Sequence, residues 1–323
     1  MALPETCSSF CLFVTKNYTT SIRLKISSIK SAEEGGNINL RNEQTEPFNI
    51  FLSRKELAEE LGADGKINII FSDKVISNEQ WLKTWQSRYS GLEVSTREQG
   101  AEITSSRVFL QADVVETLCS QNPSLNRLHS YLANHLRSQQ GCDIPYSFVT
   151  ALDEYAGYKL EPDEIILSDY SANRLGVTIG DDVTISYFVA DDLKNLSTDS
   201  LSLRVKAIIP IDVLQQDKGL SAEFPGLSDV ERCSEWDSDL PIDMDLITDE
   251  DDAYLDKYKQ TPKALISYDA VIEDWANDYG TATALRCEMN AEDVRIDNLT
   301  PEMFGLQLIH PREDALYAAN NGV

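Results

Sequence analysis

Alternating apolar and polar positions predict strands in the first part of the chain. In the segment Ser21–Ser27 every second residue is apolar, which is the period of a half-buried strand. The segments Phe48–Leu52 and Ile67–Phe71 predict two further strands. Between them, Ser53 precedes Glu56 by three residues, which is the pattern of a capping box and predicts the start of a helix.

The same order of elements returns in the second half of the chain. Ser200–Ile209 and Lys263–Ile266 predict strands. Ser267 then precedes a helical pattern, and Thr283–Cys287 predicts the last strand of the series. Because several elements return in one order, the pattern predicts an internal repeat.

The second copy has an opening that the first copy lacks. Glu164–Leu167 predicts a strand, and Ser168 starts a short helix that Gly176 ends. A turn at Gly180 then leads into a strand at Val183–Val189. The first copy is therefore predicted to be incomplete.

Helix and strand patterns alternate between the two copies. Asn78–Tyr89 predicts a helix, and Glu102–Gln111 predicts a strand. Residues 122–141 predict a second helix, because leucines recur there at spacings of three and four. Ile144–Leu152 predicts another strand, and Leu306–Ile309 predicts the last one before the C-terminus.

Together these elements predict an α+β fold of two degenerate strand-and-helix units, the first incomplete, joined by an α/β segment. A partial first unit is expected at residues 1–71, followed by a connecting segment at 72–160. The second unit is expected at 161–292, with an acidic insertion at 211–261. A C-terminal strand region at 293–323 is expected to lead toward a membrane helix.

The charge balance excludes one class of partner. The chain has 54 acidic and 28 basic residues among 323, which gives a formal net charge of −26. A surface of that sign repels phosphate backbones, so we expect no nucleic acid partner. No segment has the apolar length of a membrane helix or the pattern of a signal peptide. The chain is therefore expected to be either cytoplasmic or a piece of a larger protein.

Motifs for catalysis are not found in the sequence. It has no nucleophile elbow, no zinc-protease helix and no phosphate-binding glycine loop. The six cysteines follow no metal or disulfide framework. His129 and His135 fall in the predicted helix at 122–141, and with His310 they are expected to be surface or cap residues. We therefore expect neither an enzyme nor a bound cofactor.

The acidic insertion contains the only candidate site residues. Clustered carboxylates suit a hard cation, and the candidate Ca²⁺ ligands are Asp237, Asp239, Asp243 and Asp245. The glycine and the final glutamate of an EF-hand loop are missing, so a solvated loop is the favoured interpretation. A second interpretation is a partner-docking loop with aromatic anchors, made of Phe224, Pro225, Trp236 and Asp237.

One segment resembles a known family. Residues 165–185 read IILSDYSANRLGVTIGDDVTI, an apolar strand, a helix that ends in Leu175-Gly176, and a Gly180-Asp181 turn into the next strand. This pattern resembles the signature of the MacB-like periplasmic core in FtsX-like ABC transporter permeases, in which these four residues are structural. Further blocks of the resemblance are YLANHLR at 131–137, IPYSFV at 144–149, FPGLSD at 224–229, CSEWD at 233–237 and TPKALI at 261–266.

The resemblance implies two MacB-like units that form a non-catalytic domain on the periplasmic face of the inner membrane. It implies that the domain couples ATP hydrolysis on a separate cytoplasmic subunit to the handling of lipoprotein, lipid or envelope-protein substrates. The implied partners are the membrane helices of the parent permease, the ATPase subunit, and an envelope protein or lipoprotein. The alternative is a free-standing soluble binding protein or hydrolase with a cleft between the two copies.

Overall fold

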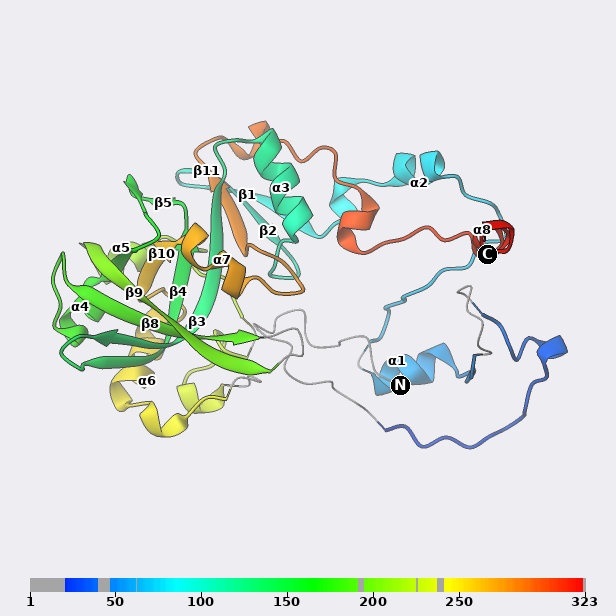
Figure 1. Ribbon diagram of the computed structural model, residues 1–323, viewed down its shortest axis with the longest axis horizontal. Coiled ribbons are helices and arrows are strands. Elements are labelled where there is room, and N and C mark those ends of the chain that lie inside the picture. Colours follow the sequence, from blue (N-terminus) through cyan, green and yellow to red (C-terminus); the bar gives the residue numbers. More distant parts are fainter. Residues whose placement is uncertain are drawn as a thin grey trace. The chain divides into compact units, whose positions relative to one another are not determined.

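The structure is a computed structural model, and its described residues divide into two units (Figure 1). Residues 86–304 form the barrel unit, and residues 21–85 with 305–321 form the terminal unit. The described residues are 21–39, 47–61, 63–190, 195–224, 226–236 and 241–321.

Six strands of the barrel unit close into a barrel. They are β3 (Asn126–Ser138), β4 (Asp143–Leu152), β7 (Glu164–Ser168), β8 (Asp182–Ala190), β9 (Leu196–Ile209) and β10 (Ala264–Ser267). Their order is β3-β4-β10-β7-β9-β8, and β8 pairs with β3 to close the ring. The β4–β10 and β7–β9 pairs are parallel, and the other four are antiparallel. A closed barrel has no unpaired edge among these strands.

Three strands extend the sheet beyond β3. They are β11 (Ala284–Cys287), β2 (Gly100–Ser105) and β1 (Leu92–Arg97), paired antiparallel in the order β3-β11-β2-β1. The short strands β5 (Glu154–Tyr155) and β6 (Tyr158–Lys159) form a separate hairpin. The helices of this unit are α3 (Ala112–Gln121), α4 (Asp169–Leu175), α5 (Ile211–Gln216), α6 (Asp249–Tyr258) and α7 (Tyr268–Trp275).

The apolar side chains of the barrel strands form two cores. In strand β7, Ile165 and Leu167 belong to the first core, together with Trp275 of α7. The other takes the intervening residues, such as Ile166, and packs them against Leu214 of α5 and against α6. Strands β7 and β10 are buried on both faces and read as nearly continuous hydrophobic runs, whereas β8 and β9 alternate buried and more exposed residues.

The terminal unit contains only helices and irregular segments among its described residues. Its helices are α1 (Arg54–Glu60), α2 (Asn78–Thr84) and α8 (Pro311–Asn321). The Ser53 side chain accepts a hydrogen bond from the Glu56 amide at the start of α1, so the predicted helix start is confirmed. No helix among the described residues combines the length and apolar character needed to cross a membrane.

The predicted fold of two repeated units is wrong. Ser21–Ser27, Phe48–Leu52 and Ile67–Phe71 contain no strand, so the first copy of the repeat is not formed. The strands of the predicted connecting segment, β3 and β4, instead pair with strands of the predicted second unit, β8 and β10. The physical reason is that alternating apolar and polar residues only show that a segment is able to form a strand. Whether the strand forms depends on a second strand with which it can pair.

Two further predictions of secondary structure are wrong. Residues 126–138 of the predicted helix at 122–141 form strand β3, because this strand is buried on both faces and its leucine spacing imitated a helical stripe. Leu306–Ile309 contains no strand, and helix α8 follows it. The elements of the predicted second copy, from β7 to β11, are formed with small shifts at their ends.

Candidate binding groove

A groove of about 690 Å³ is the larger of the two cavities described for the barrel unit. Its first wall is the segment 214–231, which begins within helix α5. Its second wall is the segment 258–262, which joins helix α6 to strand β10. Both walls lie in or next to the predicted insertion at 211–261. The volume is within the range typical of small-ligand sites.

Two arginines from the extended sheet hold the start of the first wall. Arg286 of β11 is 6% exposed and donates from Nη1 to Asp217 Oδ1 at 3.2 Å and from Nη2 to the Lys218 carbonyl at 2.9 Å. Its Nε donates to Glu102 Oε1 of β2 at 2.6 Å. Arg97 of β1 makes a second ion pair with Asp217. Charge-assisted hydrogen bonds are stronger than neutral ones, so these contacts hold Asp217 and Lys218 in place at the start of the wall.

The next residues of the first wall are attached to the barrel. Gly219 has a φ of +78°, and a Cβ there would lie 3.0 Å from both Arg286 Nη2 and Glu102, so the site suits glycine. The Leu220 carbonyl accepts from Thr150 Oγ1 of β4 at 2.8 Å. The Ala222 amide donates to Ser130 Oγ of β3 at 2.8 Å. These bonds fix the wall before any ligand binds.

The second wall is a tight turn that closes helix α6. Thr261 donates from Oγ1 to the Tyr258 carbonyl at 2.6 Å, and its own carbonyl accepts from Tyr254 Oη at 2.9 Å. Between them, Lys259 has a φ of +52°, a conformation that only a few per cent of residues other than glycine adopt. The turn presents the Lys259 side chain at the surface, 4.0 Å from Asp256.

A buried ionic cluster supports the second wall. Asp251 is 5% exposed, forms an ion pair with Arg174, lies 3.7 Å from Lys263 Nζ, and accepts from Thr248 Oγ1 at 2.7 Å. Burial alone raises the pKa of Asp251, but the Arg174 hydrogen bond and the Lys263 charge outweigh it, so the pKa is lowered. Burial lowers the pKa of Lys263 to about 8. Arg174 and Lys263 therefore share the single Asp251 carboxylate.

Charges that face the groove are distributed unequally between its walls. The first wall carries one cation, Lys218, and four carboxylates. Asp217 is paired with Arg97 and Arg286, whereas Glu223, Asp229 and Glu231 are exposed and make no ion pair among the described residues. The second wall carries Lys259 and no carboxylate. The groove is thus acidic on one side and basic on the other.

Ser221 is a buried residue in the wall of the groove. Ser221 lines the groove, is 5% exposed, and its Oγ makes no hydrogen bond within the described part of the chain. A buried polar atom without a partner costs free energy, so such atoms are uncommon in folded proteins.

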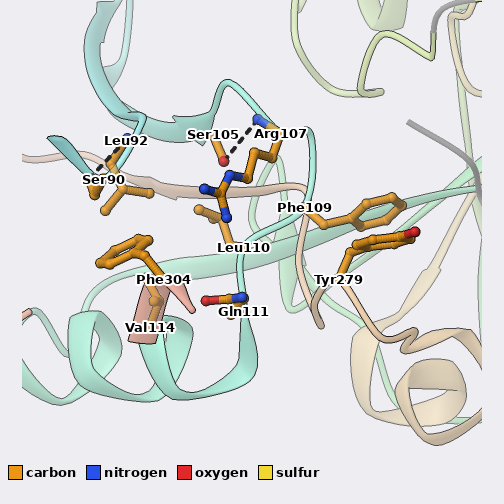
Figure 2. A pocket seen from close by; sticks show the side chains of 10 residues that line it. All are labelled: Ser90, Leu92, Ser105, Arg107, Phe109, Leu110, Gln111, Val114, Tyr279 and Phe304. Carbon is orange, nitrogen blue, oxygen red and sulfur yellow. Dashed lines mark hydrogen bonds between the residues drawn. The ribbon is translucent and has the colours of Figure 1, made fainter. Parts of the chain in front are cut away.

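A second, smaller cavity lies beside strands β1 and β2 (Figure 2). Its volume is about 50 Å³, and Figure 2 shows the Arg107 side chain pointing across it toward Leu110. The Phe109 amide donates to the Arg107 carbonyl at 2.8 Å, and Val108 between them has a φ of +67°. This is a classic γ-turn, a strained conformation for a β-branched residue. The cavity is too small for more than a side-chain-sized group.

The predicted Ca²⁺ site is not assembled by the residues that can be described. Asp237 and Asp239 lie outside the described residues. Asp243 uses its carboxylate to accept a hydrogen bond from the Asp245 amide at 3.0 Å. Among the described residues no group of three His, Cys, Asp or Glu side chains could hold a metal ion.

The predicted partner-docking aromatics lie in or against the core. Phe224 is fully buried and stacks on Phe148, with ring centroids 6.2 Å apart. Trp236 is half-buried, and its Nε1 donates to the Leu227 carbonyl at 3.1 Å. Pro225, like Asp237, lies outside the described residues. A fully buried Phe224 cannot anchor a partner, so its contacts identify it as a core residue.

The four motif residues of the resemblance shape the backbone. Leu175 is buried, and Gly176 ends helix α4 at a φ of +66°. Gly180 has a φ of +95°, and its amide donates to the Val205 carbonyl at 2.8 Å. The Asp181 carboxylate accepts from the Thr178 amide at 2.7 Å, which closes the turn before β8. These contacts agree with a structural role.

The histidines do not lie where the sequence placed them. His129 is fully buried in strand β3, where its Nδ1 lies 2.9 Å from the Thr281 carbonyl. Burial lowers the pKa of His129 to about 4, which keeps the ring neutral at pH 7. His135 lies on the same strand, 2.8 Å from the Asp143 carboxylate. The prediction that all three histidines are surface or cap residues is therefore wrong for His129.

No family model matches the chain, and a comparison with curated proteins found no match. The sequence pointed to the insertion that forms the groove but not to the residues that build it. Arg97, Glu102 and Arg286 lie far from the insertion along the chain, and no local motif connects them with Asp217. Ser221 likewise carries no sequence signal, because only its burial makes it unusual.

Proposed function

We propose that this chain is a non-catalytic, extracytoplasmic domain of an FtsX-like ABC transporter permease. In this role it moves with the membrane helices of the permease while a separate cytoplasmic subunit hydrolyses ATP. The transported or handled partner is a lipoprotein, a lipid or an envelope protein. The barrel acts as a rigid body, and differential affinity for the partner biases its movement.

One observation carries the proposal. The segment that resembles the family, from β7 to β8, has the conformation that its pattern requires, with a strand, a helix ended by Gly176, and a turn at Gly180. The segment forms two of the six barrel strands, so its pattern serves the structural frame and not a reactive site.

The buried charges also support a role without catalysis. Among the described residues the buried charged side chains are Asp251, Lys263 and Arg286, and each has an ion-pair partner. None of these three side chains lines either of the two cavities described for the barrel unit. The alternative was a free-standing soluble binding protein or hydrolase with a cleft between two copies, and such a cleft has no support because the first copy is not formed.

The gene in its own locus provides the test. The proposal expects membrane-helix sequence on both sides of this segment in one reading frame, and an ATPase gene beside it. The full-length product, purified in detergent, is then expected to retain the ATPase subunit. A reading frame without membrane helices and without an ATPase neighbour would contradict the proposal.

A further inference from the structure

We infer that the free edge of strand β9 at residues 196–202 binds an extended basic peptide, which adds to the sheet as a further strand. The inference rests on this edge alone and is independent of the proposed transporter role. When a peptide adds to a sheet edge, hydrogen bonds between the two main chains supply the affinity, and side chains beside the edge select the peptide.

Strand β9 is longer than its neighbour β7. The ring leaves no edge unpaired where its six strands overlap, but β7 pairs with β9 only over residues 204–209. Residues 196–203 of β9 extend past the start of β7, and among the described strands they pair with β8 alone (Figure 1). A strand added beside this part of β9 would therefore lie in line with β7.

The backbone groups of alternate residues face the open side of β9. The Arg204 amide donates to the Asp163 carbonyl at 2.8 Å, on the side where β7 lies. Every second residue of a strand directs its amide and carbonyl to the same side, so those of Thr198, Ser200 and Ser202 face the open side. The open edge is about 20 Å long, which fits a peptide of about six residues.

This edge has little protection against pairing with another chain. Edge strands of folded proteins are commonly protected by lysine, proline or a bulge. Residues 196–202 read LSTDSLS, without lysine or proline, and their register with β8 is regular. The Asp199 carboxylate accepts a hydrogen bond from the Ser200 amide at 2.7 Å. A cationic side chain that pairs with Asp199 competes for this carboxylate and so makes the Ser200 amide accessible to a partner strand.

Charges beside the edge select a basic peptide. The cations of β9, Arg204 and Lys206, each have a carboxylate partner. The exposed carboxylates at this edge that make no ion pair among the described residues are Glu161, Asp163 and Asp199. A peptide with alternating lysines places ammonium groups beside them. The net charge of −26 adds long-range attraction for a cation.

Hydrogen exchange measured for single amides by NMR tests the assignment. The probe is the hexapeptide Lys-Val-Lys-Val-Lys-Val with both ends blocked, added in excess to the full chain at low salt. The peptide is expected to slow exchange of the Thr198 and Ser202 amides at least tenfold. Exchange of the Leu201 amide is expected to change little, because this amide already bonds to β8. Unchanged exchange at Thr198 and Ser202 would overturn the inference.

Two control peptides, compared by calorimetry, separate strand addition from attraction between charges. Glu-Val-Glu-Val-Glu-Val has the same backbone and the opposite charge, and at least tenfold weaker binding is expected. Lys-Pro-Lys-Pro-Lys-Pro keeps the charge, but proline has no amide hydrogen, so it is also expected to bind at least tenfold more weakly. Equal binding of the two lysine peptides would reject strand addition. Equal binding of the acidic and basic valine peptides would reject the selection by charge.

Matched proline substitutions locate the edge. T198P removes an amide hydrogen that faces the open side and leaves the pairing with β8 intact. It is expected to weaken the lysine–valine peptide about tenfold at an unchanged melting temperature. T96P makes the same change on β1, the last strand of the sheet, where the Thr96 amide faces away from β2. It is expected to leave the affinity unchanged, and equal losses in the two variants would reject β9 as the site.

Charge variants provide a test that does not alter the backbone. D163N/D199N is expected to weaken the lysine–valine peptide several-fold. E116Q/E288Q makes the same change of charge at exposed positions away from β9 and is expected to leave the affinity unchanged. Equal losses in the two double variants would mean that only the net charge of the chain matters and would reject this edge.

Discussion

Apolar side chains are distributed very differently in the two units. Every buried hydrophobic residue of the described chain lies in the barrel unit, between Ala101 and Phe304. The described residues of the terminal unit include none, and they hold most of the exposed large hydrophobic residues, among them Phe48 and Phe71. Both units contain segments with strand-like alternation, so alternation alone did not produce the difference.

The difference lies in strand pairing. Each barrel strand pairs with at least two others, and the apolar side chains of these strands build the two cores. The alternating segments of the terminal unit pair with no strand among the described residues. An apolar face is buried only when a partner fixes the register that directs it to a core. Stability should therefore depend strongly on side chains of the barrel unit and weakly on those of the terminal unit.

A pair of phenylalanine substitutions gives the largest expected effect. Phe224 is fully buried between Phe109 and Phe148, whereas Phe48 is fully exposed. F224A is expected to lower the free energy of unfolding by about 3–5 kcal/mol. F48A is expected to change it by less than about 0.5 kcal/mol. Urea denaturation followed by circular dichroism measures both, and a large loss in F48A would break the comparison.

Removing one buried charge tests the ionic cluster that supports the second wall of the groove. D251N leaves Arg174 and Lys263 without their shared carboxylate in a buried position, so a loss of about 3 kcal/mol is expected. D256N removes an exposed carboxylate from the same helix and is expected to cost less than about 0.5 kcal/mol. Urea denaturation of the two variants makes the measurement. Similar losses in both would mean that the cluster adds nothing beyond net charge.

Acid should weaken the barrel through His129. Its pKa is 6.5 in a model peptide and about 4 in the fold, because burial disfavours the charged ring. Below pH 6.5 the unfolded chain binds a proton that the folded chain does not bind until about pH 4, so stability falls in this window as the pH is lowered. Between pH 6.5 and 4.5 the loss is expected to be about 2 kcal/mol.

The variant H129Q isolates this contribution. It is expected to have a flatter dependence of unfolding free energy on pH over the same window, whatever its stability at pH 7. Urea denaturation at several pH values gives the two slopes. Parallel slopes for the wild type and H129Q would show that other groups cause the acid sensitivity.

The sequence predicted those elements whose signals are local. Strand β7, helix α4 and strand β8 were predicted because Ser168, Gly176 and Gly180 mark their ends. Strand β3 was missed, because a strand buried on both faces shows no alternation. The closure of the barrel was missed as well, since pairing of β3 with β8 joins segments about fifty residues apart, and no local pattern encodes it.

The candidate site, too, could be predicted from the sequence only in part. The insertion at 211–261 was recognisable from its acidic composition, and the groove lies within or beside it. Its preorganisation comes from Arg286, Thr150 and Ser130, which belong to three different strands. Contacts of this kind appear only when the sheet has formed, so the sequence indicated the location of the site but not its construction.

A pair of glycine substitutions gives the smallest expected effect and the finest comparison. Gly176 and Gly65 both have positive φ, +66° and +75°, and neither site would bring a Cβ within 3.4 Å of another atom. An alanine at either position therefore meets the same backbone strain, about 1 kcal/mol. In the barrel unit this strain is coupled to global unfolding, because Gly176 ends a helix that packs on β4 and β7. G176A is thus expected to lower the unfolding free energy by about 1 kcal/mol, whereas G65A is expected to leave it unchanged. Urea denaturation measures both variants. An equal loss in both would mean that the two units unfold together. It would also mean that packing stabilises the terminal unit, although many of its large apolar side chains are exposed.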